Sequence, residues 1–270
     1  MTNKNDTAVL AWREKSFLNL RSGRLACGLL AVFLLPPFFG LAQERKAMNF
    51  EFNRIPAQYR SYATALGQRL VKPGKERITV SGYLSYNPES QEKALPIQII
   101  LQYPMKIRVT LPGSSMAFNR FSRTQNVPPP GRLAETIQLL LEDSVEGFLA
   151  IRSTVGLPRH LGSGYALANA AAGSPGIDIV QMTYPDVFQN GQPIVKTYWF
   201  NSITKLLGMV GYFSASGARV DIVIDDWRDV EGEKIPFLIE RYEDSKLTMR
   251  LTLSSAAVTA GIEDGTFGGN

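Results

Sequence analysis

The sequence predicts a mainly β fold, in which an antiparallel sheet is accompanied by a few helices, and three observations lead to it. The first is the region 194–253, where apolar and polar side chains alternate with period two, as in strands buried on one face. The second is the short connections of this region, which allow only antiparallel neighbours. They are Asn201-Ser202, Ser216-Gly217, Glu231-Gly232-Glu233 and Glu243-Asp244-Ser245. The third is the helical spacing of apolar residues in 54–70 and 133–151.

The N-terminus has the organisation of an export signal. Basic residues precede a charge-free stretch, 25–43, that is rich in Leu, Phe and Ala. The stretch closes on Gly40-Leu41-Ala42, which places small residues at the positions that a signal peptidase inspects. We therefore expect cleavage after Ala42, so that a signal peptide, 1–42, precedes a single domain, 43–270.

Two other interpretations of this segment are weaker. An uncleaved membrane anchor is the alternative, because the apolar run approaches the ~20 residues that a spanning helix needs. However, Pro36-Pro37 would break such a helix in its last third. Lipidation at Cys27 is not expected, since most of the apolar run follows this cysteine instead of preceding it.

Removal of the signal changes the composition. Five of the 29 Lys and Arg and two of the 24 Asp and Glu lie within 1–42, which leaves 24 basic and 22 acidic residues and a net charge of +2. No cluster of basic and aromatic residues remains that would mark a nucleic-acid surface. The mature chain has no cysteine, so its stability must come from the packed core and not from disulfides.

The first elements after the signal are a helix and three strands. The expected helix, 54–70, carries one apolar stripe and ends at Lys72-Pro73-Gly74. The stripe consists of Ile55, Tyr59, Tyr62, Leu66 and Leu70. Strands are expected at 76–86, 97–103 and 107–111, because each alternates apolar and polar residues.

The middle of the chain interrupts this pattern. Residues 122–132 contain Pro128-Pro129-Pro130 and are expected to form a stiff surface connection. The segment 133–151 is expected to form one long or two short helices. The elements expected after it are a stop at Leu157-Pro158, a strand at 164–168, a loop of small residues at 170–176 and a strand at 177–185. No internal repeat marks a second domain.

The region 194–253 then reads as a meander of strands. Its alternating apolar positions are Ile194, Tyr198 and Phe200, then Val220, Ile222 and Ile224, then Leu247, Met249, Leu251 and Leu253. In the first of these strands we interpret Lys196 and Thr197 as the polar positions. Period two over several residues indicates half-buried strands.

One segment of the meander is apolar on both faces. In 203–213 the pattern places Leu206, Val210 and Tyr212 on one side and Leu207, Met209 and Phe213 on the other. An antiparallel sheet of one layer usually faces water on one side. Either the two expected helices pack on one face while protomers or loops shield the other, or the sheet is concave and lines an apolar pocket with adaptable Met side chains.

Few residues could support catalysis. The single histidine, His160, cannot make a zinc site alone and would be the only base for a serine such as Ser163. We expect His160 in a loop between a helix end and a strand, and Gly162-Ser163-Gly164 in a flexible turn. Asp225-Asp226 and Asp229 indicate a solvated strand end more than a cation site. We therefore expect no catalytic residue, no metal and no cofactor.

The motifs of the meander carry a resemblance. WFNSITKLLGMVGYF followed by DWRDVEGEKIPFLIERY resembles the outer-membrane lipoprotein carrier superfamily, the periplasmic LolA-like and LolB-like lipoprotein localisation proteins. The hairpin positions of that signature are Trp227, Val230, Gly232 and Pro236. ERITVSGYLSY and YPMKIRVTLPG resemble the first strands of the family, with Lys106 and Arg108 at its alternating basic positions. The similarity covers most of 54–267.

The resemblance implies an incomplete barrel of about eleven curved antiparallel strands, lidded by helices, whose cavity shelters acyl chains. It also implies candidate residues. The candidates for an apolar cavity are Val80, Leu84, Ile99, Leu101, Trp199, Met209, Val210, Ile222 and Met249. Arg108 would be the lid latch, although its alternation with Ile107 and Val109 directs it outward. The sequence departs from the family at Asn201, where Asp is common, in the insertion 118–132, and in the absence of a Pro-Gly extension after Phe267.

These observations favour an exported, periplasmic, non-enzymatic protein that binds the acyl chains of lipids or lipoproteins, with carriage to the outer membrane as the role that the resemblance implies. Its expected partners are such acyl chains and the lipoprotein machinery of the inner and outer membranes, with no nucleic acid. The alternatives are an envelope-stress sensor or protein-interaction module of the same fold and, less favoured, an exported hydrolase using His160.

Overall fold

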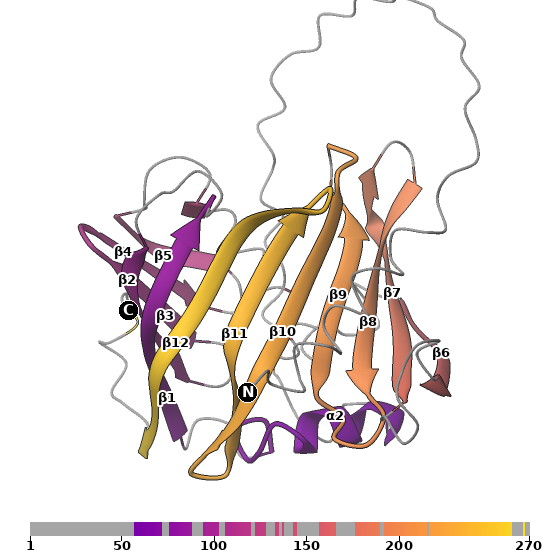
Figure 1. Cartoon of the computed structure of the whole chain (residues 1–270), viewed down its shortest axis with the longest axis horizontal. Helices are drawn as coiled ribbons and strands as arrows, with labels where there is room; N and C mark the ends of the chain where they lie inside the picture. The colour runs from indigo at the N-terminus through magenta and orange to yellow at the C-terminus, as the bar shows by residue number, and fades with distance from the viewer. Residues whose placement is uncertain are drawn as a thin grey trace, which may run out of the picture. The chain divides into compact units, whose positions relative to one another are not determined.

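The structure is a computed structural model, shown in Figure 1. It describes residues 57–71, 76–87, 94–102, 106–119, 122–127, 133–134, 137, 143–144, 157–165, 176–189, 192–214, 216–260 and 267. All of them belong to one compact unit, formed by 48–165 and 175–270. The expected signal peptide and its cleavage site after Ala42 lie outside the described residues.

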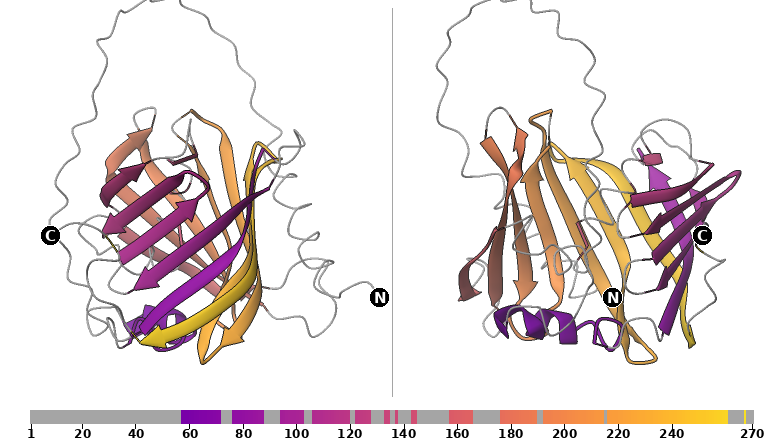
Figure 2. Two further views of the ribbon diagram at one scale, coloured as in Figure 1. Left: turned by 90° about the vertical axis from the view of Figure 1, so that its left-hand side faces the viewer. Right: turned by 180° about the vertical axis from the view of Figure 1, so that it is seen from behind.

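The described residues form one antiparallel sheet of twelve strands, in the order β5-β4-β3-β2-β1-β12-β11-β10-β9-β8-β7-β6. The strands are β1 (Glu76–Tyr86), β2 (Leu95–Gln102), β3 (Lys106–Leu111), β4 (Ser114–Asn119), β5 (Ser122–Val127), β6 (Leu157–Tyr165), β7 (Ile177–Gln189), β8 (Gln192–Asn201), β9 (Leu207–Phe213), β10 (Arg219–Val230), β11 (Glu233–Glu243) and β12 (Lys246–Ala260). Two meanders, β1–β5 and β6–β12, meet where β1 pairs with β12. The sheet curves without closing, so β5 and β6 remain its edges (Figure 2). The expected fold class is therefore confirmed.

Most expected strands are found, and the differences concern the edges of the sheet. The connection expected at 122–132 is wrong in its first half, because Ser122–Val127 is strand β5, paired with β4. Its sequence, SRTQNV, is polar except for Val127 and shows no alternation, so only the pairing with β4 reveals the strand. The described residues form twelve strands, where the resemblance implied about eleven. The Pro128-Pro129-Pro130 segment lies outside the described residues.

The expected loop at His160 is also wrong, because His160 lies in strand β6 and pairs with Val180. The strand begins at Leu157-Pro158, where we expected a stop, and β6 is an edge strand, where proline is tolerated. Gly162 and Gly164 have φ values of +155° and +70°, and the register shifts around them. The glycines thus mark bulges within a strand and not the turn that we expected.

The first expected helix is shorter than its apolar stripe. It consists of a 3-10 turn, η2 (Ala57–Tyr59), and α2 (Arg60–Thr64), which lies across one end of the sheet in Figure 1. Gly67, with a φ of +107°, prevents the helix from continuing. The described members of the stripe, Tyr59, Tyr62, Leu66 and Leu70, are all buried as expected. Of the second expected helix, 133–151, the structure describes helical Leu133, Ala134 and Ile137, which are buried, and a turn at Asp143-Ser144; the remainder lies outside the described residues.

The register of the pairings assigns side chains to two faces. We call the face that carries Val80, Tyr198, Val210, Ile222 and Leu251 the interior face, and the opposite one the outer face. In β9 the face expected for Leu207 is wrong. We expected Leu207 on the side of Met209, but Phe200 pairs with Leu207 across a bulge, which places Leu207 on the interior face. Lys196 was likewise misassigned, because it has the parity of Tyr198 and is buried on the interior face.

Candidate functional site

The interior face is a continuous apolar surface. Its side chains on β1–β4 and β7–β12 form a single hydrophobic cluster with Tyr59, Tyr62, Leu66, Leu70, Leu133, Ala134 and Ile137. The buried apolar residues that the structure describes in the two expected helices therefore pack on this face. The Tyr62 ring stacks on Phe200, with the ring centroids 4.1 Å apart. Helix α2 and the residues before and after it thus pack directly on the interior face.

The residues expected at the site divide between the two faces. Those on the interior face are Val80, Leu84, Ile99, Leu101, Val210, Ile222 and Met249. Trp199 and Met209 pair with each other on the outer face. Arg108 also lies on the outer face, as its alternation predicts, where its Nε donates to Ser115 Oγ at 3.3 Å. A binding role for any of these residues remains a prediction.

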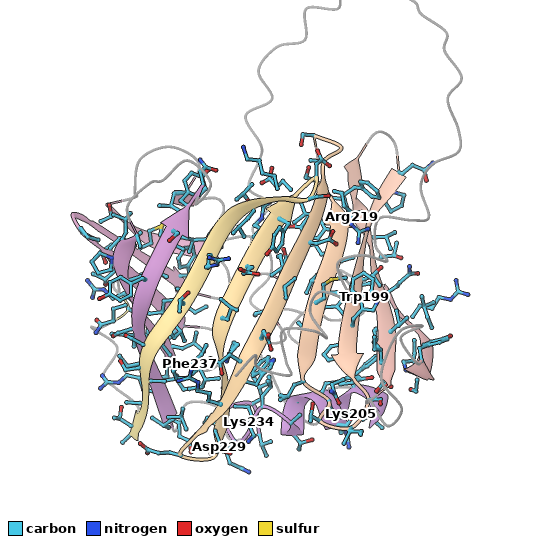
Figure 3. All side chains as sticks on the ribbon, viewed as in Figure 1. Trp199, Lys205, Arg219, Asp229, Lys234 and Phe237 are labelled. Carbon is cyan, nitrogen blue, oxygen red and sulfur yellow. The ribbon has the colours of Figure 1, made fainter. Side chains whose placement is uncertain are left out.

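The outer face has an apolar row of its own. Register aligns Ile179, Trp199, Met209 and Val223 on four adjacent strands. The Trp199 ring, labelled in Figure 3, reaches 3.0 Å from the position that a Cβ of Gly211 would take. The glycine therefore leaves room for the indole to lie flat on the sheet. Both faces of β9 are thus apolar, as the sequence indicated, and Met209 and Val210 are buried by different neighbours.

A carboxylate on β11 anchors the segment that follows α2. Glu233 Oε1 accepts the backbone N–H of Gln68 at 2.5 Å and of Arg69 at 3.0 Å, and its Oε2 accepts Arg69 Nη1 at 2.8 Å. In addition, the Lys234 N–H donates to the Leu66 carbonyl at 3.0 Å. Arg69 and Glu233 are 3% and 1% exposed, so the ion pair is desolvated and strong only while both partners stay in place. No sequence pattern indicates this anchor, since Glu233 reads as a turn residue.

A second carboxylate, Asp178 on β7, anchors α2 itself. Its Oδ2 accepts the Tyr62 hydroxyl at 3.3 Å and Lys205 Nζ at 2.6 Å, and its Oδ1 accepts the Gly164 N–H at 3.3 Å. Burial alone would raise the pKa of Asp178, but the hydrogen bond and charge of Lys205 outweigh it and hold the pKa below its ordinary value. Lys205 projects from the turn between β8 and β9, at the α2 end of the sheet (Figure 3). Asn201 Oδ1 shapes that turn by accepting the N–H groups of Ile203 and Thr204, both at 2.9 Å.

Besides the anchors Asp178 and Glu233, a further group of polar side chains, which we call the interior polar cluster, lies on the interior face: Asp143, Lys196, Tyr212 and Arg241. Lys196 Nζ forms an ion pair with Asp143 Oδ1 and lies 4.6 Å from the centroid of the Tyr212 ring. Burial raises the pKa of Tyr212; the Asp143 carboxylate raises it further and Arg241 offsets part of the effect. The sequence held a signal for this cluster, since Lys196 shares the parity of Tyr198 and Phe200, and Arg241 that of Ile235, Phe237 and Ile239.

The structure offers limited support for catalysis. Ser163 Oγ and His160 Nε2 are 3.1 Å apart on the exposed edge strand. A catalytic serine also needs a group that orients the histidine. Within the described residues, Asp178 interacts with Ser163 and binds Gly164, Lys205 and Tyr62, and none of the described contacts joins it to His160. The described residues contain no group of three or more side chains suited to a metal ion, and no helix among them is long and apolar enough to span a membrane.

Comparison with solved structures finds matches at low sequence identity. A DUF1329 family protein from Desulfovibrio piger has a TM-score of 0.52 and 9% identity, over 77% of this chain and 95% of that one. A domain described as an outer membrane lipoprotein-sorting protein domain, from Vibrio parahaemolyticus, has a TM-score of 0.48 and 8% identity, over 73% and 90% of the chains. A LolA superfamily protein from Nitrosomonas europaea has a TM-score of 0.43 and 14% identity, over 77% and 96%. No family model and no curated protein sequence matches the chain.

These similarities concern the fold alone. The match to the DUF1329 family protein shows a shared fold, whereas TM-scores below 0.5 are too low to support an inference. What the resemblance implied for the architecture, a curved and incomplete antiparallel barrel with a helical cover, is present in this chain.

Proposed function

We propose that the protein is exported to the periplasm and binds the acyl chain of a lipid or lipoprotein on the interior face of its sheet, without catalysing a reaction. One observation carries the proposal. The continuous apolar interior face is covered near α2 by a short segment that polar contacts hold in place, through Glu233 and Asp178. Such a cover can leave as a unit when its few anchors break.

The dimensions of the interior face suit an acyl chain. On β11 it runs from Glu233 to Arg241, eight residues or about 26 Å. A bilayer core of about 30 Å holds two acyl chains end to end, so one chain needs about 15 Å. Each buried methylene contributes about 0.8 kcal/mol, which is enough for capture without any catalytic group. The incoming chain would replace the contacts that Tyr62, Leu66 and Leu70 make in the covered form.

A fluorescent fatty acid tests the proposal with a matched pair of variants. We expect the mature protein to bind it saturably, and Glu233→Gln to take it up roughly ten-fold faster, because one charged hydrogen bond of the cover, worth about 1.5–3 kcal/mol, is weakened. Lys234→Gln is the control. Lys234 pairs with exposed Asp229 at 2.9 Å and keeps its backbone bond to Leu66 after substitution, so its uptake rate should match the parent.

The outcomes separate the proposal from its alternatives. A folded mature protein that shows no saturable uptake would contradict acyl binding and favour an interaction or sensor module of the same fold. Uptake at equal rates in Glu233→Gln and the parent would contradict the role of the cover. Hydrolysis of an ester substrate that disappears in His160→Ala would support the hydrolase alternative.

A further inference from the structure

The interior polar cluster lies at the end of the interior face away from α2. Phe200 and Leu207, next to the cover, are four and five residues along their strands from Lys196 and Tyr212. Arg241 is eight residues from the anchor at Glu233. Figure 3 shows the same two ends of the sheet: Lys205 and Lys234 lie at the α2 end, and Arg219 lies at the opposite end. Arg219 precedes Val220, which pairs with Tyr212 of the cluster. The apolar face is therefore closed by α2 at one end and polar at the other.

Within the described residues, three buried polar atoms of this cluster have no hydrogen-bond partner. They are Asp143 Oδ2, the Tyr212 hydroxyl oxygen and Arg241 Nε. Asp143, Arg241 and Tyr212 are only 1%, 4% and 6% exposed, so water does not satisfy these atoms from the surface. A buried polar group without a partner costs about 1–3 kcal/mol. Three such atoms around one point indicate a position that another polar group fills.

The charges of the cluster fit an anion. Lys196 and Arg241 supply two cations on the interior face, and the Tyr212 hydroxyl and Arg241 Nε, although close to Asp143 and to each other, make no hydrogen bond of ordinary geometry. Lys196 is neutralised by Asp143, which belongs to a different segment of the chain and not to the sheet. Arg241 Nη1 is held by Glu243, whose side chain is 41% exposed, and by Thr248 Oγ1 at 3.4 Å. A guanidinium with a free Nε–H is a preferred donor to carboxylates and phosphates.

We propose that the interior polar cluster binds the oxyanion head, a carboxylate or phosphate, of the acyl ligand whose tail lies on the interior face. Asp143 is the resident anion that the head replaces on Lys196, while Arg241 Nε and the Tyr212 hydroxyl donate to the head. This inference rests on the proposed function and adds an orientation to it. The tail runs from the cluster along β8, β9 and β11 toward the segment that α2 covers.

The test compares a fluorescent fatty acid with its uncharged methyl ester, which shares the same tail. We expect the parent to bind the acid at least about ten-fold more tightly, because hydrogen bonds to charged groups contribute about 1.5–3 kcal/mol. Lys196→Met, which keeps a long unbranched side chain, should abolish the preference and leave ester binding intact. Arg219→Gln is the matched control, because Arg219 lies at the same end of the sheet but on the outer face, paired with Asp221 at 2.7 Å.

A second variant decides the question if Lys196→Met does not fold. Asp143→Asn removes the competing anion, so it should increase the preference for the acid over the ester, with the melting temperature recorded as a check on folding. Added inorganic phosphate at millimolar concentration should not displace the acid, because a free anion has no tail.

Each result has a distinct meaning. If the parent binds acid and ester saturably and with equal affinity, this inference is overturned, and a buried water is the group that satisfies the three atoms. The proposed function would still stand. An unchanged preference in Lys196→Met or a lower one in Asp143→Asn would also overturn the inference. Binding of neither probe would contradict the proposed function itself.

Discussion

Val210 and Val223 show at the residue scale how the two faces of one sheet differ. Val210 is fully buried on the interior face between Tyr198 and Ile222, whereas Val223 lies partly exposed on the outer face opposite Met209. Replacing either by threonine changes little volume and adds one hydroxyl. In Val210→Thr that hydroxyl enters an apolar cluster, so we expect the free energy of unfolding to fall by about 1–3 kcal/mol. In Val223→Thr it can reach water, and the change should stay within about 0.5 kcal/mol.

Urea denaturation of the mature protein measures both values. The two valines lie in adjacent central strands, so differences in strand propensity largely cancel between them. Equal losses in the two variants would contradict the assignment of faces given by the register. A larger loss in Val223→Thr than in Val210→Thr would mean that the outer face is the better packed one.

At the scale of elements, Asp178 joins four parts of the fold: β7, β6 through Gly164, the turn of Lys205, and α2 through Tyr62. Its pKa is lowered in the folded protein, so the carboxylate adds stability above its unfolded pKa of about 3.9, and this stability is lost as the pH falls through the folded pKa. The difference in unfolding free energy between the parent and Asp178→Asn should therefore be largest above pH 5 and shrink below pH 4. A difference that is constant or grows on acidification would contradict this contribution.

The elements that could be predicted from the sequence are those whose own pattern determines them. The alternation of 194–253 predicts β8–β12, and the apolar stripe of Tyr59, Tyr62, Leu66 and Leu70 predicts the buried side of the cover. Edge strand β5 and most of β6 could not be predicted, because sequences without alternation become strands only through pairing with a neighbour, and only the end of β6 overlaps the strand expected at 164–168. The bulge between Trp199 and Phe200 could not be predicted either. Because it adds one residue to β9, it moves Leu207 to the other face of the sheet.

The candidate site shows the same limit. Interior apolar residues such as Val80 and Ile222 follow from parity, but the anchors do not, since Arg69 and Glu233 are 164 residues apart in the sequence. Tyr62 and Asp178 are separated by 116 residues. The interior position of Lys196 could have been recognised from its parity with Tyr198 and Phe200, because a long cationic side chain on a buried face needs a partner.

At the scale of the whole molecule, the proposed function depends on the compartment in which the protein folds. Residues 43–270 contain no cysteine, so export to an oxidising compartment would leave the fold unaffected by disulfide chemistry. In the folded protein, the covered interior face keeps its large apolar side chains out of water. These features are compatible with the predicted signal, whose cleavage can be tested directly.

We expect export with cleavage after Ala42, because the basic flank, the charge-free run 25–43 and the small residues Gly40 and Ala42 match the requirements of a signal peptidase. N-terminal sequencing of the protein from the cell envelope should then begin at Gln43. Ala42→Leu places a bulky side chain at the cleavage position and should accumulate the uncleaved precursor, whereas Leu41→Ala, at a position that the peptidase does not inspect, should be processed like the parent. A membrane-bound protein that still begins near Met1 would instead identify residues 25–43 as an anchor, and the sheet would then bind its ligand while tethered to the membrane.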